Sequence, residues 1–380
     1  MVRAPRPRTA ALRSAVASRH VVALFAGFVA ALVVAVAPAR AHVRYVTPGG
    51  DPVAAVAFLV TVFSDPLNLA LLGGGAVAVC ATLVGYYRYR PFRRDVAVWR
   101  STLASYDDLL PWMLRLSVGL PLVGAGFSGY LFSPAVEAAG SQFVRLFGIS
   151  VGFLLLFGLA TRVVAAVGLL GYLVALAIDP TVLLAVEFVP GLIALVLLGS
   201  GRPSADHVLA SLADDGRTAY SRLDPIYRRV SLPFRRRIDP YRALVPTILR
   251  VGVGVAFCLL GVTQKLLNPG PALAVVEKYG LTGVVPVEPA MWVVGAGLSE
   301  LLVGLVLVVG LGTRGAAAVA FLLFTTTLFG LPDDPVLVHV SMFGLVSALL
   351  VTGAGPFSLD ARLGAGTDAV PADERATPAD

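Results

Sequence analysis

The chain has 380 residues, of which 57% are apolar and only 14% charged, and its formal net charge is +7. This composition excludes an ordinary soluble domain and is typical of a polytopic membrane protein. The positive charge does not indicate a nucleic-acid partner. The basic residues lie mostly in loops between apolar runs, where the positive-inside rule places them.

The N-terminus predicts a targeting segment. Several arginines precede an apolar stretch over 21–36, which is followed by the small-x-small cleavage pattern Ala39-Arg40-Ala41. We therefore expect a signal peptide over 1–41, with an uncleaved signal anchor as the alternative.

Nine further apolar runs are long enough to cross most of a bilayer at about 1.5 Å per residue. The predicted spans are 66–87, 111–131, 142–159, 162–178, 182–198, 245–266, 290–309, 314–330 and 336–352. A shorter apolar run over 53–63 predicts an interfacial or re-entrant helix. The predicted fold class is thus all-α, a polytopic transmembrane helical bundle.

The distribution of arginine predicts the orientation. Two arginine-rich loops, 88–100 and 202–242, fall on the same side of the membrane by the span count. The positive-inside rule makes that side cytoplasmic. We expect a multi-pass plasma-membrane protein whose mature N-terminus is outside and whose C-terminus is cytoplasmic.

The sequence contains two similar copies of one segment. The segments 114–134 and 249–269 align, and the agreement continues at fixed spacing for roughly a hundred residues. Aligned pairs include Arg115 with Arg250, Gly119 with Gly254, Gly126 with Gly261, Pro134 with Pro269, Arg162 with Arg314, and Glu187 with His339. The paired glycines predict close helix packing. Because each copy has an even number of spans, the repeats should be parallel.

The predicted organisation follows from these features. It comprises the signal segment 1–41, an N-terminal membrane region 42–110 with one span, a degenerate first four-helix repeat 111–205, a basic cytoplasmic linker 206–243, a second four-helix repeat 244–362, and a disordered polar tail 363–380.

The two copies differ in charge within the membrane. Glu300 lies near the middle of a predicted span, whereas the first copy has Gly148 there. Lys265 likewise aligns with Tyr130. An intramembrane carboxyl costs a few kcal/mol, so Glu300 should face the bundle interior, have a partner and serve in proton exchange; packing alone is the alternative.

Three further polar residues, Gln264, Lys265 and His339, complete the candidate site. Lys265 follows Gln264 at the outer end of its span, where snorkelling to the headgroups is as good an explanation as ligand binding. His339 is the only histidine in a predicted span. It is either a hydrogen-bond donor to a quinone or a satisfied core residue.

Several cofactors are not expected. One membrane histidine cannot supply bis-histidine haem ligation or a copper–haem centre, and no metal-ligand cluster is apparent. The GxGxxG pattern over 124–129 lies inside a predicted span with no preceding strand, so it predicts helix packing, not nucleotide binding.

The second copy resembles the DoxX family, which includes the DoxD-type small subunit of thiosulfate:quinone oxidoreductase. The matching elements are Leu249-Arg250, Gly261-x-x-x-Lys265, Glu300 within the segment 299–314, His339, and the closing segment 355–360 (GPFSLD). The resemblance implies a four-helix membrane module associated with quinone-linked redox complexes, often without a cofactor of its own.

Three functions remain open. The first is a DoxX-like subunit that binds a quinone or lipid-like ligand near the outer leaflet. Glu300 would exchange the proton, Lys265, Gln264 and His339 would bind the ligand, and a redox partner protein would supply electrons. The second is a non-enzymatic scaffold or assembly factor for a redox or secretion complex. The third, a small-solute carrier, is weakened by the parallel repeats.

Overall fold

The computed structural model describes residues 53–137, 141–223, 227–333 and 336–363. The chain divides into two units, Met1–Ala39 and Arg40–Asp380, and every described residue belongs to the second. The predicted signal peptide and the tail from 364 onward lie outside the described residues. Helices make up most of the described chain, which confirms the predicted all-α class.

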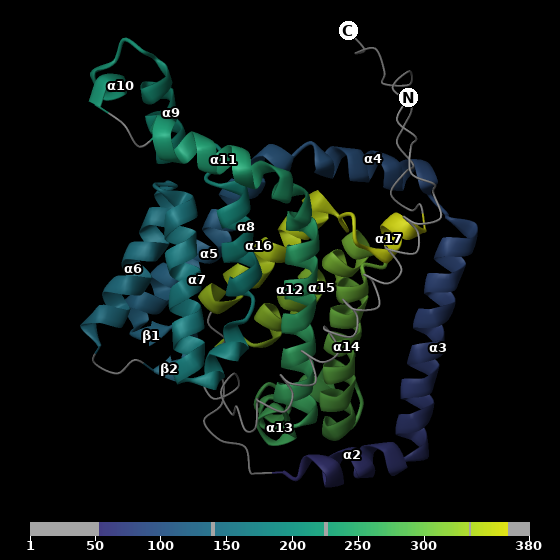
Figure 1. Cartoon of the computed structure of the whole chain (residues 1–380). Coiled ribbons are helices and arrows are strands. Elements are labelled where there is room, and N and C mark those ends of the chain that lie inside the picture. The colour runs from purple at the N-terminus through teal and green to yellow at the C-terminus, as the bar shows by residue number, and fades with distance from the viewer. Residues whose placement is uncertain (1–52, 138–140, 224–226, 334–335, 364–380) are drawn as a thin grey trace, which may run out of the picture. The chain divides into compact units, whose positions relative to one another are not determined.

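In the part of the chain that the structure describes, three helices precede the bundles: α2 (Ala55–Ser64), α3 (Pro66–Tyr89) and α4 (Arg93–Ala104). The Asp65 carboxylate begins α3 by accepting hydrogen bonds from the amides of Leu67 and Asn68, which would otherwise have no helical partner. Figure 1 shows α2 and α4 running across the two ends of α3. The predicted short helix over 53–63 is therefore present as α2.

The first bundle follows directly. It consists of η1 (Asp107–Leu109), α5 (Leu110–Ser128), the strands β1 (Tyr130–Leu131) and β2 (Ser133–Glu137), α6 (Gln142–Phe157), α7 (Thr161–Ile178), η2 (Pro180–Ala185) and α8 (Phe188–Leu198). The strands form one antiparallel ribbon. The linker then contains α9 (Ala205–Asp214), α10 (Ala219–Leu223), η3 (Tyr227–Ser231), α11 (Leu232–Ile238) and η4 (Asp239–Leu244).

The second bundle repeats the helical order of the first. It consists of α12 (Val245–Gly261), the π-helical turn η5 (Val262–Leu266), α13 (Pro269–Lys278), η6 (Leu281–Gly283), α14 (Pro289–Val309), α15 (Thr313–Gly330) and α16 (Val336–Thr352), and α17 (Leu359–Arg362) follows it. The principal helix pairs are equivalent, because α5 packs along α6 as α12 packs along α14.

A buried arginine ties the helices of the first bundle together. Arg115 is 2% exposed and donates hydrogen bonds to four backbone carbonyls. Two belong to the end of α6, Leu155 at 2.8 Å and Leu156 at 2.6 Å, and two to the segment after α8, Ser200 at 2.8 Å and Pro203 at 2.6 Å. One guanidinium thus satisfies carbonyls that the helix ends leave without partners.

Arg250 has the same role in the second bundle. It is 1% exposed and donates to Leu307 at 2.8 Å and to Val308, both at the end of α14. It also donates to Ala354 at 3.1 Å and Phe357 at 3.0 Å, after α16. Each arginine thus donates to two carbonyls at the end of one helix and to two in the segment after another, so α5 and α12 are held to corresponding neighbours.

An aspartate from a later segment of the chain caps the N-terminus of α7 in the first bundle and of α15 in the second. Asp206 accepts hydrogen bonds from the amides of Ala160 at 2.6 Å and Thr161 at 2.9 Å, at the start of α7. Asp360 accepts from Gly312 at 2.7 Å and Thr313 at 3.0 Å, at the start of α15. A carboxylate at a helix N-terminus satisfies free amides and favours the helix dipole.

The two bundles pack directly against each other through α5 with α16 and α8 with α12. Gly344 allows this contact, because a Cβ there would lie 1.5 Å from the Ser117 hydroxyl oxygen. Gly252 also lies close to Pro190, because a Cβ on Gly252 would lie 2.4 Å from the Pro190 Cβ. Large apolar side chains such as Leu345 are fully buried in the resulting continuous core.

Within the described residues, six helical stretches are long and apolar enough to cross a membrane. They are Pro66–Tyr89, Arg93–Ser128, Thr161–Ile178, Tyr227–Leu266, Pro289–Val309 and Thr313–Gly330. The three other predicted spans coincide with shorter apolar helices, Gln142–Phe157, Phe188–Leu198 and His339–Thr352. The protein is therefore a multi-pass membrane protein.

The arginine-rich segments lie together. Figure 1 shows α4, α9, α10, α11 and α17 at one end of the long helices, and α2, α13 and the β1–β2 ribbon at the other. The loops 88–100 and 202–242 therefore share an end, as the charge distribution predicts. Which end is cytoplasmic stays a prediction.

The sequence places two element boundaries incorrectly. The predicted span 111–131 ends at Ser128, because Gly129 takes a left-handed conformation (φ +84°) and turns the chain into the ribbon. The predicted span 182–198 is interrupted, and α8 begins only at Phe188. Pro190 then lies in the first turn, where a missing N–H costs no helical hydrogen bond.

We predict that Arg250→Met lowers the free energy of unfolding by about 3 kcal/mol or more. The substitution leaves four carbonyls without their charged donor, and hydrogen bonds to charged groups contribute about 1.5–3 kcal/mol each. Thermal unfolding of the purified protein in detergent measures the loss. Arg235→Met is the control, because Arg235 is 58% exposed and forms only a 3.9 Å pair with Asp239. Equal unfolding midpoints for the two variants would contradict the assigned role of Arg250.

Candidate functional site

The end of α12 is shaped by a π-helical turn, η5, that places Lys265. The Thr263 hydroxyl donates to the Leu259 carbonyl at 2.7 Å, and the Asn268 side-chain amide donates to the Thr263 carbonyl at 2.8 Å. These two bonds provide donors for backbone carbonyls that the wider π-turn leaves without an α-helical hydrogen bond. A π-turn shifts the following side chains around the helix axis and is frequent at functional sites. Lys265 therefore points along α14.

Two glycines allow α12 and α14 to meet next to this turn. A Cβ on Gly261 would lie 2.6 Å from the Gly297 carbonyl oxygen and 3.1 Å from the Glu300 Cβ. A Cβ on Gly297 would lie 3.1 Å from the Lys265 Cβ. The predicted role of Gly261 in close packing is confirmed. This close approach brings the side chains at 265 and 300 within reach of each other.

Lys265 and Glu300 form an ion pair. The Lys265 Nζ donates to both carboxylate oxygens of Glu300, at 2.7 Å to Oε1 and 2.8 Å to Oε2. Their side chains are 23% and 24% exposed, so the pair lies at the edge of the bundle, open on one side. Glu300 thus has the partner that its position requires. Lys265 does not snorkel away from the bundle.

The first bundle has no such pair at the equivalent positions. Gly148 replaces Glu300, and a Cβ there would lie 3.0 Å from the Leu122 carbonyl oxygen and 3.2 Å from the Gly126 Cα. Tyr130 replaces Lys265, but it belongs to β1, not to a continuing helix. Both the local backbone and the helix spacing of the first bundle therefore exclude a Lys–Glu pair in this place.

Gln264 lies beside the ion pair but is directed differently. It is 4% exposed, and its Nε2 donates to the Thr263 hydroxyl at 3.2 Å. Neighbouring residues of η5 thus place one polar side chain in the interior and one at the partly exposed edge. Its predicted part in ligand binding stays a prediction.

His339 is placed by a different set of contacts. It lies on α16, is 9% exposed, and meets the Phe324 ring edge-on at 6.2 Å between centroids. Phe324 packs in turn on Phe257 of α12, at 5.1 Å. The sequence left two alternatives open for His339, and these aromatic contacts agree with the second, a core residue whose polar groups are satisfied. The ligand role of His339 stays a prediction.

The sequence missed one polar contact between the bundles. The Ser341 hydroxyl of α16 donates to Glu187 Oε1 at 3.2 Å, and both residues are buried. Glu187 lies at the break between η2 and α8, not inside a helix. The sequence did indicate that the Glu187 carboxyl is unusual, because it lies in an apolar run. Its partner, Ser341, lies 154 positions away, and no spacing rule identifies a partner at that distance.

A second Lys–carboxylate pair lies outside the spans. Lys278, at the end of α13, donates to Asp333 Oδ2 at 2.8 Å, and the Tyr279 hydroxyl donates to the same oxygen at 3.0 Å. The hydrogen bond from Lys278 lowers the pKa of Asp333, and the same bond raises the pKa of Lys278. This exposed pair offers a matched control for Lys265 and Glu300.

One part of the chain is similar to a known protein family. The DoxX family model matches residues 245–353. The matched DoxX segment runs from the first residue of α12 to the end of α16 and contains both members of the ion pair. The resemblance predicted from the sequence is thereby confirmed. No curated protein and no solved structure matches the chain.

Within the DoxX segment, the Lys265–Glu300 pair brings together two ionisable groups. Among the described residues, no group of three or more His, Cys, Asp and Glu side chains could hold a metal ion. Lys265 offers an ammonium donor and Glu300 a carboxylate acceptor, side by side at a partly exposed edge.

We predict that Gly261→Ala weakens the fold by about 1–3 kcal/mol, because its methyl group would force α12 away from α14. Gly295→Ala is the matched control on α14, since its Cβ would have nothing within 4 Å. Alanine there should leave stability unchanged or raise it by up to about 1 kcal/mol. Thermal unfolding in detergent compares the two, and equal midpoints would contradict the close approach.

Proposed function

We propose that this chain is the membrane subunit of a quinone-linked redox complex and that the Lys265–Glu300 pair is its quinone-headgroup site. The observation that carries the proposal is the pair itself, a donor and an acceptor held together in the apolar body of a DoxX segment. Ionisable groups at membrane depth are costly, and they mark ligand or proton pathways by default.

The donor set of this edge fits a quinone. A bound quinone supplies two-electron, two-proton redox chemistry. The Lys265 ammonium can donate a hydrogen bond to a ring carbonyl oxygen, and the Glu300 carboxylate can take up or return the proton at Oε1 or Oε2. Both side chains are about one-quarter exposed, so a ligand dissolved in the bilayer can approach the pair from the lipid side.

The asymmetry of the two bundles supports a single site. We infer that the bundles arose by duplication, because the hydrogen bonds of Arg115 and Arg250 join corresponding segments. The first bundle retains these structural bonds but has Gly148 in place of the carboxylate. It therefore supports the second bundle without repeating its chemistry.

The surroundings of the proposed subunit follow from the charge distribution. The arginine-rich end faces the cytoplasm of a plasma-membrane protein, and the site lies toward the outer leaflet. In this proposal a partner protein supplies the electrons, and this chain binds the quinone. The second candidate function is a scaffold. It is favoured by one observation: Lys265 and Glu300 satisfy each other and could serve only to hold α12 to α14.

We predict that the purified wild-type chain carries bound quinone and that Glu300→Gln and Lys265→Met each reduce the quinone content at least tenfold. Lys265→Met removes the ammonium donor, and Glu300→Gln removes the carboxylate that pairs with this ammonium and exchanges the proton. Lipid extraction followed by chromatography with mass detection measures quinone per protein. Lys278→Met and Asp333→Asn are the controls, because they break the exposed pair and should leave the quinone content unchanged. Unchanged content in the Glu300 and Lys265 variants would refute the site.

The charge-reversed double variant, Lys265→Glu with Glu300→Lys, separates the two functions. It restores an ion pair between α12 and α14 but exchanges the positions of donor and acid. We expect normal abundance in membranes together with a loss of turnover of an added short-chain quinone. A pair that only holds helices together would instead recover full activity of the complex in this variant.

A further inference from the structure

The linker between the two bundles ends in a strongly basic stretch, residues 227–242. It comprises η3, α11 and most of η4, and α12 begins three residues later at Val245. The basic stretch contains six arginines and a single acidic residue, Asp239. The arginines are Arg228, Arg229, Arg235, Arg236, Arg237 and Arg242, and all six are exposed. Positive charge is thus concentrated on the surface directly before a membrane-crossing helix.

Exposed apolar side chains are interleaved with these arginines. Val230 is 60% exposed, Phe234 45% and Tyr241 55%. Each is next to an arginine in the chain, because Arg229 precedes Val230 and an arginine follows both Phe234 and Tyr241. Exposure of apolar surface to water is unfavourable, and its burial against a partner would recover that free energy. A partner that fits the basic stretch therefore provides negative charge and apolar surface side by side.

The basic stretch lies where the apolar helices end. It is anchored at its C-terminal end, because η4 packs against α8 and α12. Figure 1 shows α11 running across the end of these helices, whereas α10 lies farther from them. Arg237 precedes Val245 by eight residues of one helical stretch, about 12 Å, which is comparable with a Debye length of about 8 Å at physiological salt. The headgroups beside α12 are therefore within reach of the arginines.

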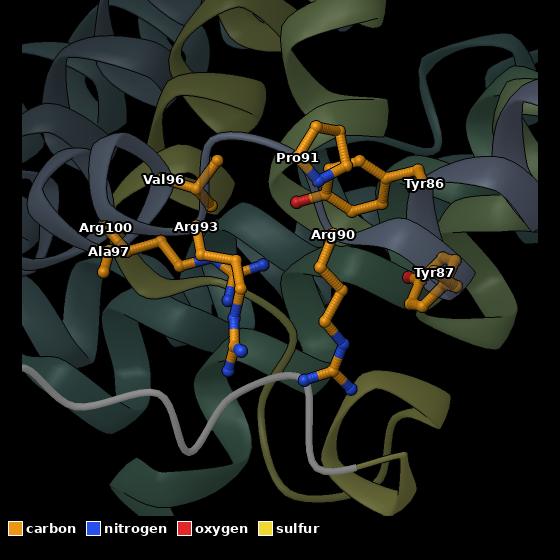
Figure 2. A pocket seen from close by; sticks show the side chains of 8 residues that line it. All are labelled: Tyr86, Tyr87, Arg90, Pro91, Arg93, Val96, Ala97 and Arg100. Atoms are coloured by element: carbon orange, nitrogen blue, oxygen red, sulfur yellow. The ribbon is translucent and has the colours of Figure 1, made fainter.

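The other arginine-rich loop, 88–100, presents its charges differently. Figure 2 shows Arg90, Arg93 and Arg100 around the turn between α3 and α4, together with tyrosine and apolar side chains. Arg90 and Arg100 are only partly exposed, and all three arginines interact with other residues of the chain. The basic stretch, whose six arginines are all exposed, is the more open of the two surfaces.

We propose that the basic stretch lies on the surface of the adjoining leaflet and binds the headgroups of anionic phospholipids. The arginines donate hydrogen bonds to lipid phosphates, whose oxygens match the planar fork of a guanidinium. Val230, Phe234 and Tyr241 contact the glycerol and upper acyl carbons beside those phosphates. A bilayer surface combines anionic and apolar groups at this spacing, which an acidic soluble protein does not. The lipid contact is independent of the Lys265–Glu300 pair.

The simpler explanation of these arginines is that they only set the membrane orientation. They would then act while the chain inserts and would have no lipid partner in the folded protein. In that case the lipid composition of the leaflet would not change the accessibility of the basic stretch. The two hypotheses therefore differ in a property that can be measured on the folded chain.

Limited proteolysis of the full chain in lipid nanodiscs tests the proposal, because trypsin cleaves after arginine. One set of discs contains dioleoylphosphatidylcholine alone, and the other an equal mixture with dioleoylphosphatidylglycerol. Mass spectrometry of the fragments gives the cleavage rate after each arginine. Arg217 and Arg222 are the internal controls, because they belong to the same linker but lie outside the basic stretch.

We expect cleavage after Arg235, Arg236 and Arg237 to be at least fivefold slower in the discs with phosphatidylglycerol, while cleavage after Arg217 and Arg222 changes less than twofold. Salt at about 1 M, where the Debye length is about 3 Å, should remove most of this protection. Equal slowing at both groups of arginines would overturn the basic stretch as the binding surface in favour of diffuse attraction. Unchanged cleavage at every site would overturn the anionic bilayer as its partner and favour an acidic soluble protein.

The variant Phe234→Ser tests the apolar contact, because it keeps every charge of the basic stretch. We expect it to lose at least half of the protection that phosphatidylglycerol gives after Arg235. Phe92→Ser is the matched control, since Phe92 is 77% exposed and lies outside the basic stretch, and it should keep the protection of the wild-type chain. Full protection in the Phe234 variant would overturn the contact of this ring with lipid.

Discussion

Backbone carbonyls at helix ends constrain this molecule more than any other groups, because in an apolar surrounding they have no water to bond to. Arg115 and Arg250 meet that constraint. Each donates to the last carbonyls of one helix and to the chain that follows another, so a single side chain fixes three segments. A buried guanidinium is tolerable only when its donors are satisfied, and here each one has four carbonyl partners.

The two bundles share one arrangement of helices but differ in the side chains that lie between the paired helices. In the first, α6 approaches α5 so closely at Gly148 that no side chain fits between them. In the second, the helix after Gly261 widens into a π-turn, and the space accommodates Lys265 beside Glu300. The proposed duplication, followed by divergence of one half, would explain why the first bundle has no Lys–Glu pair at the equivalent positions. The half without the Lys–Glu pair would then contribute packing surface for α16 and α12.

Much of the architecture could be predicted because membrane-crossing segments follow simple rules. Apolar runs located nine helices to within a few residues, and the distribution of arginine indicated which loops share an end. The predicted helix boundaries were wrong at two places where the local sequence ends or interrupts a helix, at Gly129 and near Pro190. The sequence also marked Glu300 as costly in an apolar run and Lys265 as one of only two lysines, without showing that they touch.

The sequence alone determined the class of the protein, its apolar helices, the equivalence of Arg115 with Arg250, and the position of the unusual acid. These are properties of composition and spacing, which act locally. Only the tertiary structure decided that Lys265 pairs with Glu300 and that His339 lies among aromatic rings. Those outcomes depend on how closely helices approach and how a turn directs a side chain, and both are set by packing between segments distant in the chain.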